Sequence, residues 1–352
     1  MIVFICNSPF QILSAALIRR TYYPKDRAGI ILTDASKALI KFKNSALESL
    51  FERIEHIEIY EKMKQLEGYS NMEIPDRRVG EIAFKLFEQI DMENVTDLYY
   101  ANLHAWIYCL IDLLRNRGIR THYYEDGMDS YIVNVNVPYI EKPYDIFVYQ
   151  PELMLENKGS AIRRIPSINE VPSEIQEEID SVFNTYDTEF NLPDVVFFEQ
   201  HSDSKDDYKY IDDLFIKINE ITNHRAMIKS HPRRRKSDIR IDPYRWVTDT
   251  PWELIAYKEE LTNKLIIGIS SRAMFTIPIM TKDRPMIILL YRLLIKLTGK
   301  DIKWWHITDE YVDRWTELYG RGKVLIPNSI EELRQILFAV MERIGDKNNG
   351  EA

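Results

Sequence analysis

The sequence predicts an α/β protein made of two successive halves, each a parallel sheet covered by helices. Short, continuously apolar runs alternate with stretches of helical period, which is typical of strands that are buried on both faces of a sheet. The length of 352 residues corresponds to about two domains of ordinary size. Hydrophobic residues make up 45% and charged residues 29%, so the chain can form two cores and is not of a disordered class.

The first half begins with an apolar run over residues 1–5, followed by a helical pattern through Phe10, Leu13 and Leu17. Further strands are predicted at 29–32, 54–59, 95–100 and 119–124, and helices at 80–91 and 103–117. From about residue 155 to 173 the sequence becomes irregular and rich in Pro, Gly and Asn. We therefore predict a first domain over 1–155 and a linker over 156–190.

The second domain, predicted over 191–352, repeats the alternation. Its strands are predicted at 194–199, 225–229, 265–269, 285–290 and 323–326, and its helices at 207–220, 252–259, from 271, and at 329–343. Asn328 and Ser329 before two glutamates predict a capped start of the last helix. Two successive doubly wound halves predict the GT-B architecture, in which two Rossmann-like domains face an interdomain cleft.

Composition excludes several classes of protein. The net charge of −9 makes the chain a poor candidate for bulk nucleic-acid binding. Cys6 and Cys109 lie in apolar surroundings, which predicts buried free thiols in a reducing compartment. The amino terminus lacks a cationic leader, and the longest apolar stretch, 285–297, is broken by Arg292 and Lys296. We therefore expect a cytoplasmic protein.

Four polar segments directly follow predicted strands, at the edge where parallel sheets bind ligands. They are Asn7-Ser8-Pro9-Phe10-Gln11, Glu125-Asp126-Gly127, His231-Pro232 and Ser270-Ser271. Each alone has an ordinary structural explanation: a helix cap, an acidic turn, a surface histidine or another helix cap. They occur in both halves, however, where one cleft would collect them.

The residue types point to a transfer reaction. The adjacent carboxylates of Glu125 and Asp126 raise each other's pKa, which suits one of them to accept a proton from a sugar hydroxyl. His231, whose backbone is restricted by Pro232, can donate a hydrogen bond to a phosphate or protonate a leaving group. The set implies a phosphate-bearing donor held by the second half and a hydroxyl acceptor deprotonated by the first.

Cationic and hydroxyl groups near His231 support an anion site in the second half. The basic residues are Lys229, Arg233, Arg234, Arg235 and Lys236, which could equally be a solvated loop or contact anionic lipid headgroups. Ser270 and Ser271 add hydroxyls at the start of a helix, where backbone N–H groups bind anions.

The motifs resemble a known family. Glu125-Asp126-Gly127, His231-Pro232 and Ser270-Ser271, in that order, resemble the D/E-D/E-G, HP and serine motifs of bacterial sialyltransferases. The stretch Cys-Asn-Ser-Pro-Phe-Gln-Ile-Leu-Ser-Ala at 6–15 and the stretch Tyr-Tyr-Glu-Asp-Gly-Met-Asp-Ser-Tyr at 123–131 are most similar to glycosyltransferase family 52. That family includes lipooligosaccharide and capsule sialyltransferases. The resemblance spans most of the chain, and its specificity comes from the order and spacing of short motifs.

The resemblance implies that CMP-sialic acid is the donor substrate and a galactose-terminated oligosaccharide of a surface glycan is the acceptor, joined in an inverting, α-2,3-type transfer. Glu125 or Asp126 would deprotonate the acceptor hydroxyl. His231 would stabilise or protonate the departing CMP phosphate, helped by Ser270 and Ser271. A monophosphate leaving group needs less neutralisation than a diphosphate, and the sequence has no convincing Asp-x-Asp motif. We therefore expect no metal and no further cofactor.

Alternatives remain open at this stage. Glu199 or Asp203, which follow the strand at 194–198, could serve as the base instead. The family also holds glucosyltransferases, so the donor could be another nucleotide sugar. A nonenzymatic RNA-binding or anion-binding protein could use the segment 225–246, which has eight basic and two acidic residues, but the acidic remainder of the chain argues against a nucleic-acid partner.

Two further partners are compatible with the sequence. An enzyme that finishes lipid-linked glycans could contact the inner face of the cell membrane through Arg233 to Lys236 and the pair Trp304-Trp305. A homodimer is also compatible with the sequence, which does not reveal the oligomeric state.

Overall fold

The chain forms two parallel-sheet α/β domains. The structure, a computed structural model, describes residues 1–44, 46–66, 77–90, 92–102, 104–127, 129–132, 142–155, 159–200, 205–231, 239–246, 248, 250–280, 284–299, 304–320 and 322–348. Contacts divide the chain into Met1–Thr188 and Glu189–Ala352. All strand pairs among the described residues are parallel. The predicted α/β class is confirmed.

The first domain holds a sheet of seven strands among its described residues. The strands are β1 (Ile2–Cys6), β2 (Ala28–Thr33), β3 (Arg53–Ile57), β4 (Asp97–Tyr100), β5 (Arg120–Tyr124), β6 (Asp145–Val148) and β7 (Ala161–Arg164). The helices are α1 (Pro9–Tyr22), α2 (Leu47–Leu50), α3 (Ile59–Lys64), α4 (Arg77–Glu88), α5 (Ala105–Asn116), α6 (Asp129–Ile132) and α7 (Ser173–Phe183).

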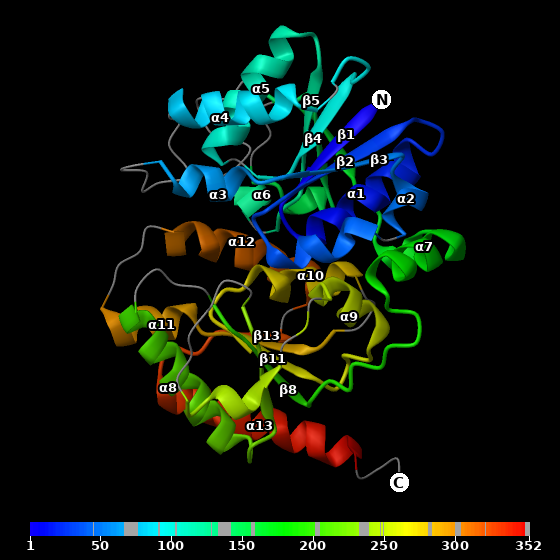
Figure 1. Ribbon diagram of the computed structural model, residues 1–352. Helices are drawn as coiled ribbons and strands as arrows, with labels where there is room; N and C mark the ends of the chain where they lie inside the picture. The colour runs from blue at the N-terminus through cyan, green and yellow to red at the C-terminus, as the bar shows by residue number, and fades with distance from the viewer. Residues whose placement is uncertain are drawn as a thin grey trace. The chain divides into compact units, whose positions relative to one another are not determined.

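The strand order of this sheet is β3-β2-β1-β4-β5-β6-β7. The chain builds outwards from β1 to β3 and then crosses back to β4 on the other side of β1. The topological switch point therefore lies between β1 and β4. Right-handed crossovers place the helices of the two directions on opposite faces of the sheet. Figure 1 shows α1 and α2 on one side of this sheet and α4 and α5 on the other.

Apolar side chains on both faces explain the central strands. All five residues of β1 are buried, as are all six of β2. The Phe4 ring stacks on Tyr99 of β4, with ring centroids 4.6 Å apart, and Tyr124 of β5 packs edge-on against it at 6.2 Å. Because neither face of these strands meets water, their sequences are continuous apolar runs.

A buried ionic network lies near the amino ends of β4 and β6. The His122 imidazole sits between the carboxylates of Asp97, at 2.9 Å, and Asp145, at 3.4 Å. Arg120 pairs with Asp97 at 2.8 Å and Arg163 with Asp145 at 3.0 Å. Burial alone raises the pKa of the Asp97 carboxyl, but hydrogen bonds from His122 and Arg120 act against burial and hold the pKa well below its usual value.

We expect Asp97→Asn to destabilise the protein by about 2 kcal/mol at neutral pH and by progressively less as the pH falls. A carboxyl with a lowered folded-state pKa contributes stability above its unfolded pKa of about 3.9 and loses it as the pH falls through the folded value. Urea denaturation of both proteins at neutral pH and at about pH 3 measures this convergence. A difference that is the same at every pH would show that packing, and not charge, is lost.

The second domain holds a sheet of six strands among its described residues. The strands are β8 (Val195–Phe198), β9 (Ala226–Lys229), β10 (Arg245–Trp246), β11 (Leu265–Gly268), β12 (Met286–Leu289) and β13 (Val324–Leu325). The helices are α8 (Lys205–Ile221), α9 (Trp252–Lys258), α10 (Arg272–Met280), α11 (Tyr291–Thr298), α12 (Trp304–Tyr319) and α13 (Ile330–Asn348).

The strand order of the second sheet, β10-β9-β8-β11-β12-β13, places its switch point between β8 and β11. Helix α8 packs against α11 and α13, and α9 packs against α10. The α12 indole of Trp315 donates a hydrogen bond to the carbonyl of Phe275 on α10, at 3.2 Å. The predicted cap of α13 is confirmed, because the Ser329 hydroxyl accepts the Glu332 N–H at 3.1 Å.

The main correction concerns the predicted linker. The sequence predicts a linker over 156–190, but β7 and α7 occupy this segment and belong to the first domain, which ends at Thr188. Strand β7 escaped prediction because it is an edge strand, three of whose four residues are exposed, so that it has no apolar run. Strand β6 and helices α11 and α12 are also absent from the prediction.

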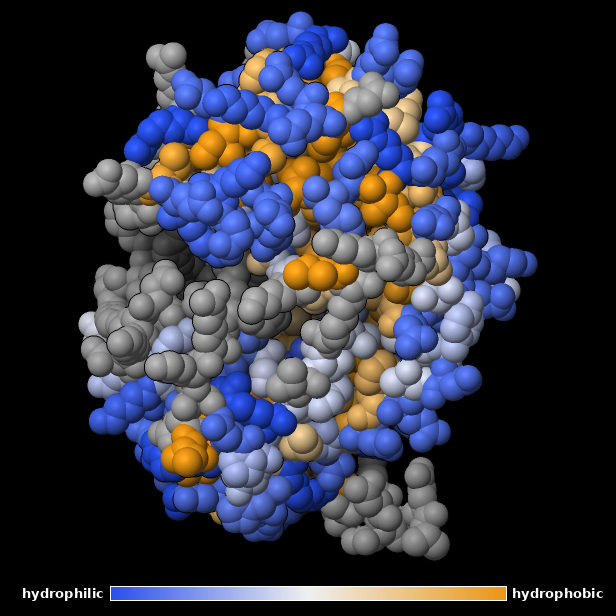
Figure 2. Space-filling view, in the orientation of Figure 1, coloured by the Kyte–Doolittle hydropathy of each residue, from blue (hydrophilic) through white to orange (hydrophobic). Residues whose placement is uncertain are grey.

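The hydropathy of the surface and the exposure of the two cysteines can also be compared with the sequence predictions. In the described part of the chain, no helix is both long and apolar enough to span a membrane. Figure 2 shows hydrophilic residues (blue) over much of the visible face, with hydrophobic residues (orange) in separate patches. Cys6 is buried, as predicted, and burial raises the pKa of its thiol to about 12. The same prediction is wrong for Cys109, which is partly exposed.

Candidate active site

The predicted site residues of the first domain lie at the carboxyl edge of its sheet, beside the switch point. Asn7 and Ser8 follow β1, and Glu125, Asp126 and Gly127 follow β5, two strands along in the sheet. Open parallel sheets bind their ligands at this edge, next to the point where the strand order reverses.

Gln11, which ends the first strand-end segment but was assigned no role from the sequence, joins these two segments. Its side-chain amide accepts a hydrogen bond from the Asn7 N–H, at 2.5 Å, and donates one to the Asp126 carboxylate, at 2.6 Å. Gln11 lies in the first turn of α1 and is 1% exposed. Ser8 is the N-cap of this helix, and its hydroxyl accepts the Gln11 N–H at 3.3 Å. A serine followed three residues later by glutamine is a capping-box pattern, the signal that could have identified Gln11.

The two adjacent carboxylates have different surroundings. Glu125 is 1% exposed, and its Oε2 accepts hydrogen bonds from the Tyr131 hydroxyl and from the Tyr149 N–H, the latter at 2.8 Å. Asp126 is the more exposed of the two, and its own N–H donates to the Ser130 hydroxyl at 2.8 Å. Glu125 therefore anchors the end of β5 to the end of β6, whereas Asp126 lies nearer the surface.

Gly127 produces the turn that separates these surroundings. Its φ of +92° lies in the left-handed region, which residues with a Cβ rarely adopt. The Ser130 N–H then donates to the Gly127 carbonyl at 3.0 Å, at the start of α6. The turn brings Ser130 and Tyr131 back towards the two carboxylates.

Two buried amide atoms at the switch point have no hydrogen-bond partner among the described residues. The Thr33 hydroxyl donates to Asn7 Oδ1 at 2.5 Å, which leaves Asn7 Nδ2 buried and unpaired. The Oδ1 of Asn102, a residue that lies two positions after β4, is likewise buried and has no hydrogen-bond partner among the described residues. Both asparagines are 7% exposed. Leaving such an atom without a hydrogen bond costs about 1–3 kcal/mol, so a ligand or water that hydrogen-bonds to both atoms would bind favourably. No pattern in the sequence identified Asn102 as a site residue.

In the second domain, His231 is held by a buried ion pair at the carboxyl ends of β8 and β9. The His231 N–H donates to Glu199 Oε2 at 3.0 Å. Glu199 is 3% exposed, and its two oxygens accept hydrogen bonds from both Nη atoms of Arg245, one of them at 3.0 Å. A carboxylate engaged in this way is poorly suited to deprotonate an acceptor. Glu199, an alternative base by sequence, is better described as a positioning residue for His231, and Arg245 is a partner that the sequence analysis missed.

Lys229 and the serine pair border the same edge of the sheet. The Lys229 ammonium lies 5.8 Å from the centre of the Trp246 ring, a cation–π distance. Ser270 and Ser271 follow β11 and directly precede α10, across the switch point from β8. Neither serine hydroxyl forms a hydrogen bond with another described residue. Both can therefore donate to a ligand at the helix start.

Gly268, the last residue of β11, permits the close approach of β8 at this switch point. A Cβ there would lie 3.2 Å from the Cβ and the carbonyl oxygen of Phe198, and closer still to the Met274 sulfur. We expect Gly268→Ala to destabilise the protein by about 1–3 kcal/mol in thermal or urea unfolding. In the control Gly29→Ala, the new Cβ meets nothing nearer than 3.5 Å, so stability should stay within about 1 kcal/mol of wild type. Equal losses in both variants would contradict the argument.

Part of the predicted site lies outside the described residues. These positions are Asp203, Pro232, Arg233, Arg234, Arg235 and Lys236. Among the described residues, no cluster of His, Cys, Asp and Glu is suited to hold a metal ion. The expectation that the reaction needs no metal remains a prediction.

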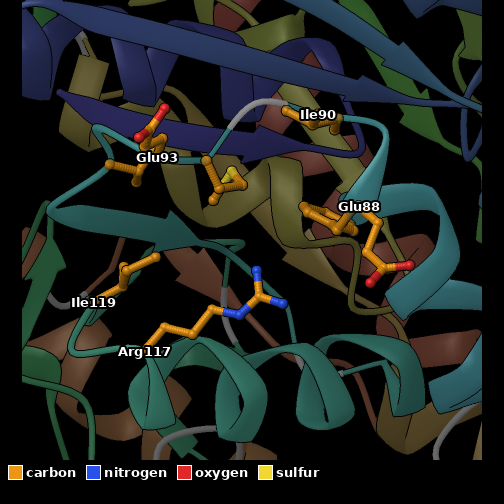
Figure 3. A pocket seen from close by; sticks show the side chains of 8 residues that line it. Glu88, Ile90, Glu93, Arg117 and Ile119 are labelled. Atoms are coloured by element: carbon orange, nitrogen blue, oxygen red, sulfur yellow. The ribbon is translucent and has the colours of Figure 1, made fainter.

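A cavity of about 600 Å³ opens elsewhere, at the amino ends of β4 and β5. Figure 3 shows Glu88, Ile90, Glu93, Arg117 and Ile119 around it. None of the site residues predicted from the sequence lines this cavity, and it lies at the edge opposite to the one where parallel sheets bind their ligands.

Comparisons with known proteins define the fold. No protein-family model matches the sequence, and no curated protein matches it in a sequence comparison. UDP-GlcNAc 2-epimerase from Methanocaldococcus jannaschii has a similar structure, with a TM-score of 0.53 and 13% identity over 97% of this chain and 91% of that one. UGT89C1 from Arabidopsis thaliana, solved with quercetin, has a TM-score of 0.52 and 9% sequence identity over 97% of this chain and 90% of that one. The protein has the predicted GT-B fold of two parallel-sheet α/β domains.

Proposed function

We propose that the protein is an inverting glycosyltransferase, which moves a sugar from a nucleotide-sugar donor to an acceptor hydroxyl. The observation that carries this proposal is the contrast between the two adjacent carboxylates at the carboxyl edge of the first sheet. Glu125 is buried and anchored, whereas Asp126 is more exposed and oriented by Gln11. The GT-B fold supports the proposal, since one structural neighbour is named for a nucleotide sugar, UDP-GlcNAc.

In the proposed reaction, Asp126 accepts the proton of the acceptor hydroxyl. The acceptor oxygen then forms a bond to the anomeric carbon while the bond from that carbon to the phosphate oxygen breaks, and the bonding electrons leave with the phosphate. Attack from the face opposite the leaving group inverts the anomeric centre. His231 donates a hydrogen bond or a proton to the departing phosphate, and Ser270 and Ser271 add hydroxyl donors.

We further propose that the donor is CMP-sialic acid and the acceptor a terminal galactoside, with the first domain serving the acceptor and the second binding CMP. The order of the three motifs supports this choice. A single phosphate suits a site made of one histidine and two serine hydroxyls. A surface-glycan acceptor on a lipid carrier would bring the enzyme to the inner face of the cell membrane.

Calorimetric titration with CMP and with UDP, together with transfer assays from CMP-sialic acid and from UDP-sugars to lactose, tests the proposal. We expect CMP to bind, and His231→Ala to weaken its binding at least about tenfold, the value of one lost charge-assisted hydrogen bond. His224→Ala is a matched control, because His224 lies in the same domain, in the turn before β9 at the opposite edge of the sheet.

Three outcomes would contradict the proposal in different ways. Binding of UDP but not CMP would identify another nucleotide sugar as the donor. CMP binding that is equally strong in His231→Ala would remove the role of this histidine. Binding of RNA with steep salt dependence, and no binding of either nucleotide, would favour the nonenzymatic alternative.

A further inference from the structure

We infer that Asn7 and Asn102 form a subsite that binds a hydroxyl group of the acceptor, a neutral sugar; this inference rests on the proposed function. The two asparagines follow β1 and β4, the strands that flank the switch point of the first sheet. Asn7 Nδ2 and Asn102 Oδ1 are buried and lack a partner among the described residues.

The two residues leave neighbouring strands at the same edge of the sheet. Strand β1 pairs with β4 in a register whose last pair is Phe4 opposite Tyr99. Asn7 and Asn102 each lie three positions beyond this pair, after the ends of their strands. Neighbouring strands lie about 4.8 Å apart, so a small group at this edge of the sheet lies close to the ends of both strands.

The two unpaired atoms differ in kind, which identifies the ligand chemistry. Asn7 Nδ2 can only donate a hydrogen bond, and its orientation is set by the Thr33 hydroxyl on Oδ1. Asn102 Oδ1 can only accept one. A sugar hydroxyl donates one hydrogen bond and accepts up to two, so a single hydroxyl satisfies both atoms. An ionised carboxylate or a phosphodiester has acceptors only and would leave Asn102 Oδ1 unsatisfied.

The subsite is linked to the proposed base through one side chain. Gln11 accepts the N–H of Asn7 and donates to the Asp126 carboxylate, at 2.5 and 2.6 Å. An acceptor sugar held by Asn7 is therefore bound by a residue that Gln11 connects to Asp126. This arrangement suits a sugar with one hydroxyl in the subsite and another presented to the base.

Steady-state kinetics with lactose and CMP-sialic acid, and lactose binding measured by NMR without donor, test the inference. We expect Asn7→Asp, which replaces the donor Nδ2 by an acceptor, and Asn102→Leu each to raise KM for lactose about tenfold, or about 1.4 kcal/mol. The control is Asn116→Leu, an exposed asparagine at the far end of α5, which should behave as wild type.

The possible failures are distinguishable. An unchanged KM for lactose, with higher thermal stability of Asn102→Leu, would show that the amides bind only water and would overturn the inference. Thermal stabilisation of the protein by phosphate or free sialic acid, if it is lost in Asn102→Leu, would show that the subsite binds an anion. That result would overturn the inference of a neutral ligand. If wild type neither binds CMP nor hydrolyses CMP-sialic acid, the proposed function fails instead, and lactose binding by NMR still decides the subsite.

Discussion

An Asp126→Asn variant is expected to transfer sugar about 10²–10⁴ times more slowly than wild type, the usual contribution of a general base. The amide has the shape of the carboxylate, and its oxygen can still accept the hydrogen bond from Gln11 that holds Asp126 in wild type. The fold should therefore be retained while the proton acceptor is lost. The measurement is kcat for transfer from CMP-sialic acid to lactose, with CMP affinity and donor hydrolysis as readouts that should change little.

Glu125→Gln is the matched comparison. In wild type, the Glu125 Oε2 accepts hydrogen bonds from the Tyr131 hydroxyl and the Tyr149 N–H. The amide oxygen can accept both only as a neutral group, with the NH₂ group buried in the place of Oε1, so we expect a loss of stability of about 1–3 kcal/mol. Its main effect should be on unfolding and its lesser effect on kcat. The reverse pattern, with normal transfer in Asp126→Asn and slow transfer in a stable Glu125→Gln, would exchange the two roles.

Gln11→Met separates positioning from proton transfer. Gln11 donates a hydrogen bond to Asp126, but its amide is not basic and cannot take up the proton of the acceptor hydroxyl. We expect kcat to fall less than in Asp126→Asn and the pH profile of kcat to shift, because the Asp126 carboxylate loses a donor that favours its charged form. Loss of a donor to the charged form raises the pKa, so the acidic limb of the profile should move to higher pH. A profile of unchanged position would contradict this role.

Arg245→Met is expected to have the largest effect on stability, a loss of about 3–5 kcal/mol. The substitution removes the guanidinium that neutralises the Glu199 carboxylate, which is 3% exposed. Because Glu199 also accepts the His231 N–H, CMP affinity should fall as well. Urea denaturation and CMP titration measure the two effects. The double variant Glu199→Gln/Arg245→Met should recover part of the lost stability, since it no longer buries the negative charge that Arg245 neutralises in wild type.

A surface ion pair in the same domain provides the control. Arg314 and Glu310 pair at 3.3 Å on α12 with side chains 40% and 59% exposed. Exposed pairs of this spacing contribute about 0.3–0.5 kcal/mol, so Arg314→Met should change stability by less than about 1 kcal/mol. A similarly small loss in Arg245→Met would show that the Glu199–Arg245 pair does not hold the ends of β8 and β9 together.

Several elements could be predicted because their signal is local. Strands β1 and β11 are apolar over their whole length, so the segments Ile2–Cys6 and Leu265–Gly268 could be predicted as buried strands. Strand β7 could not be predicted in this way, because Ala161–Arg164 lies at the sheet edge and has no apolar run. Gln11 lies in a strand-end segment that the sequence identifies, but its role could not be predicted, because its partner Asp126 is 115 positions away in the sequence.

Local patterns in the chain predict the α/β class, the two parallel sheets and the set of polar residues that follow their strands, because buried strands and strand ends have characteristic compositions. The differences among those polar residues arise from contacts between distant segments. Glu125 is buried beside Tyr149 while Asp126 is held by Gln11, Glu199 is paired with Arg245, and Asn7 and Asn102 follow neighbouring strands. These relations join residues that are distant in the chain. A side chain's burial and hydrogen-bond partners depend on the segments that folding brings beside it, and spacing within one segment carries no record of them.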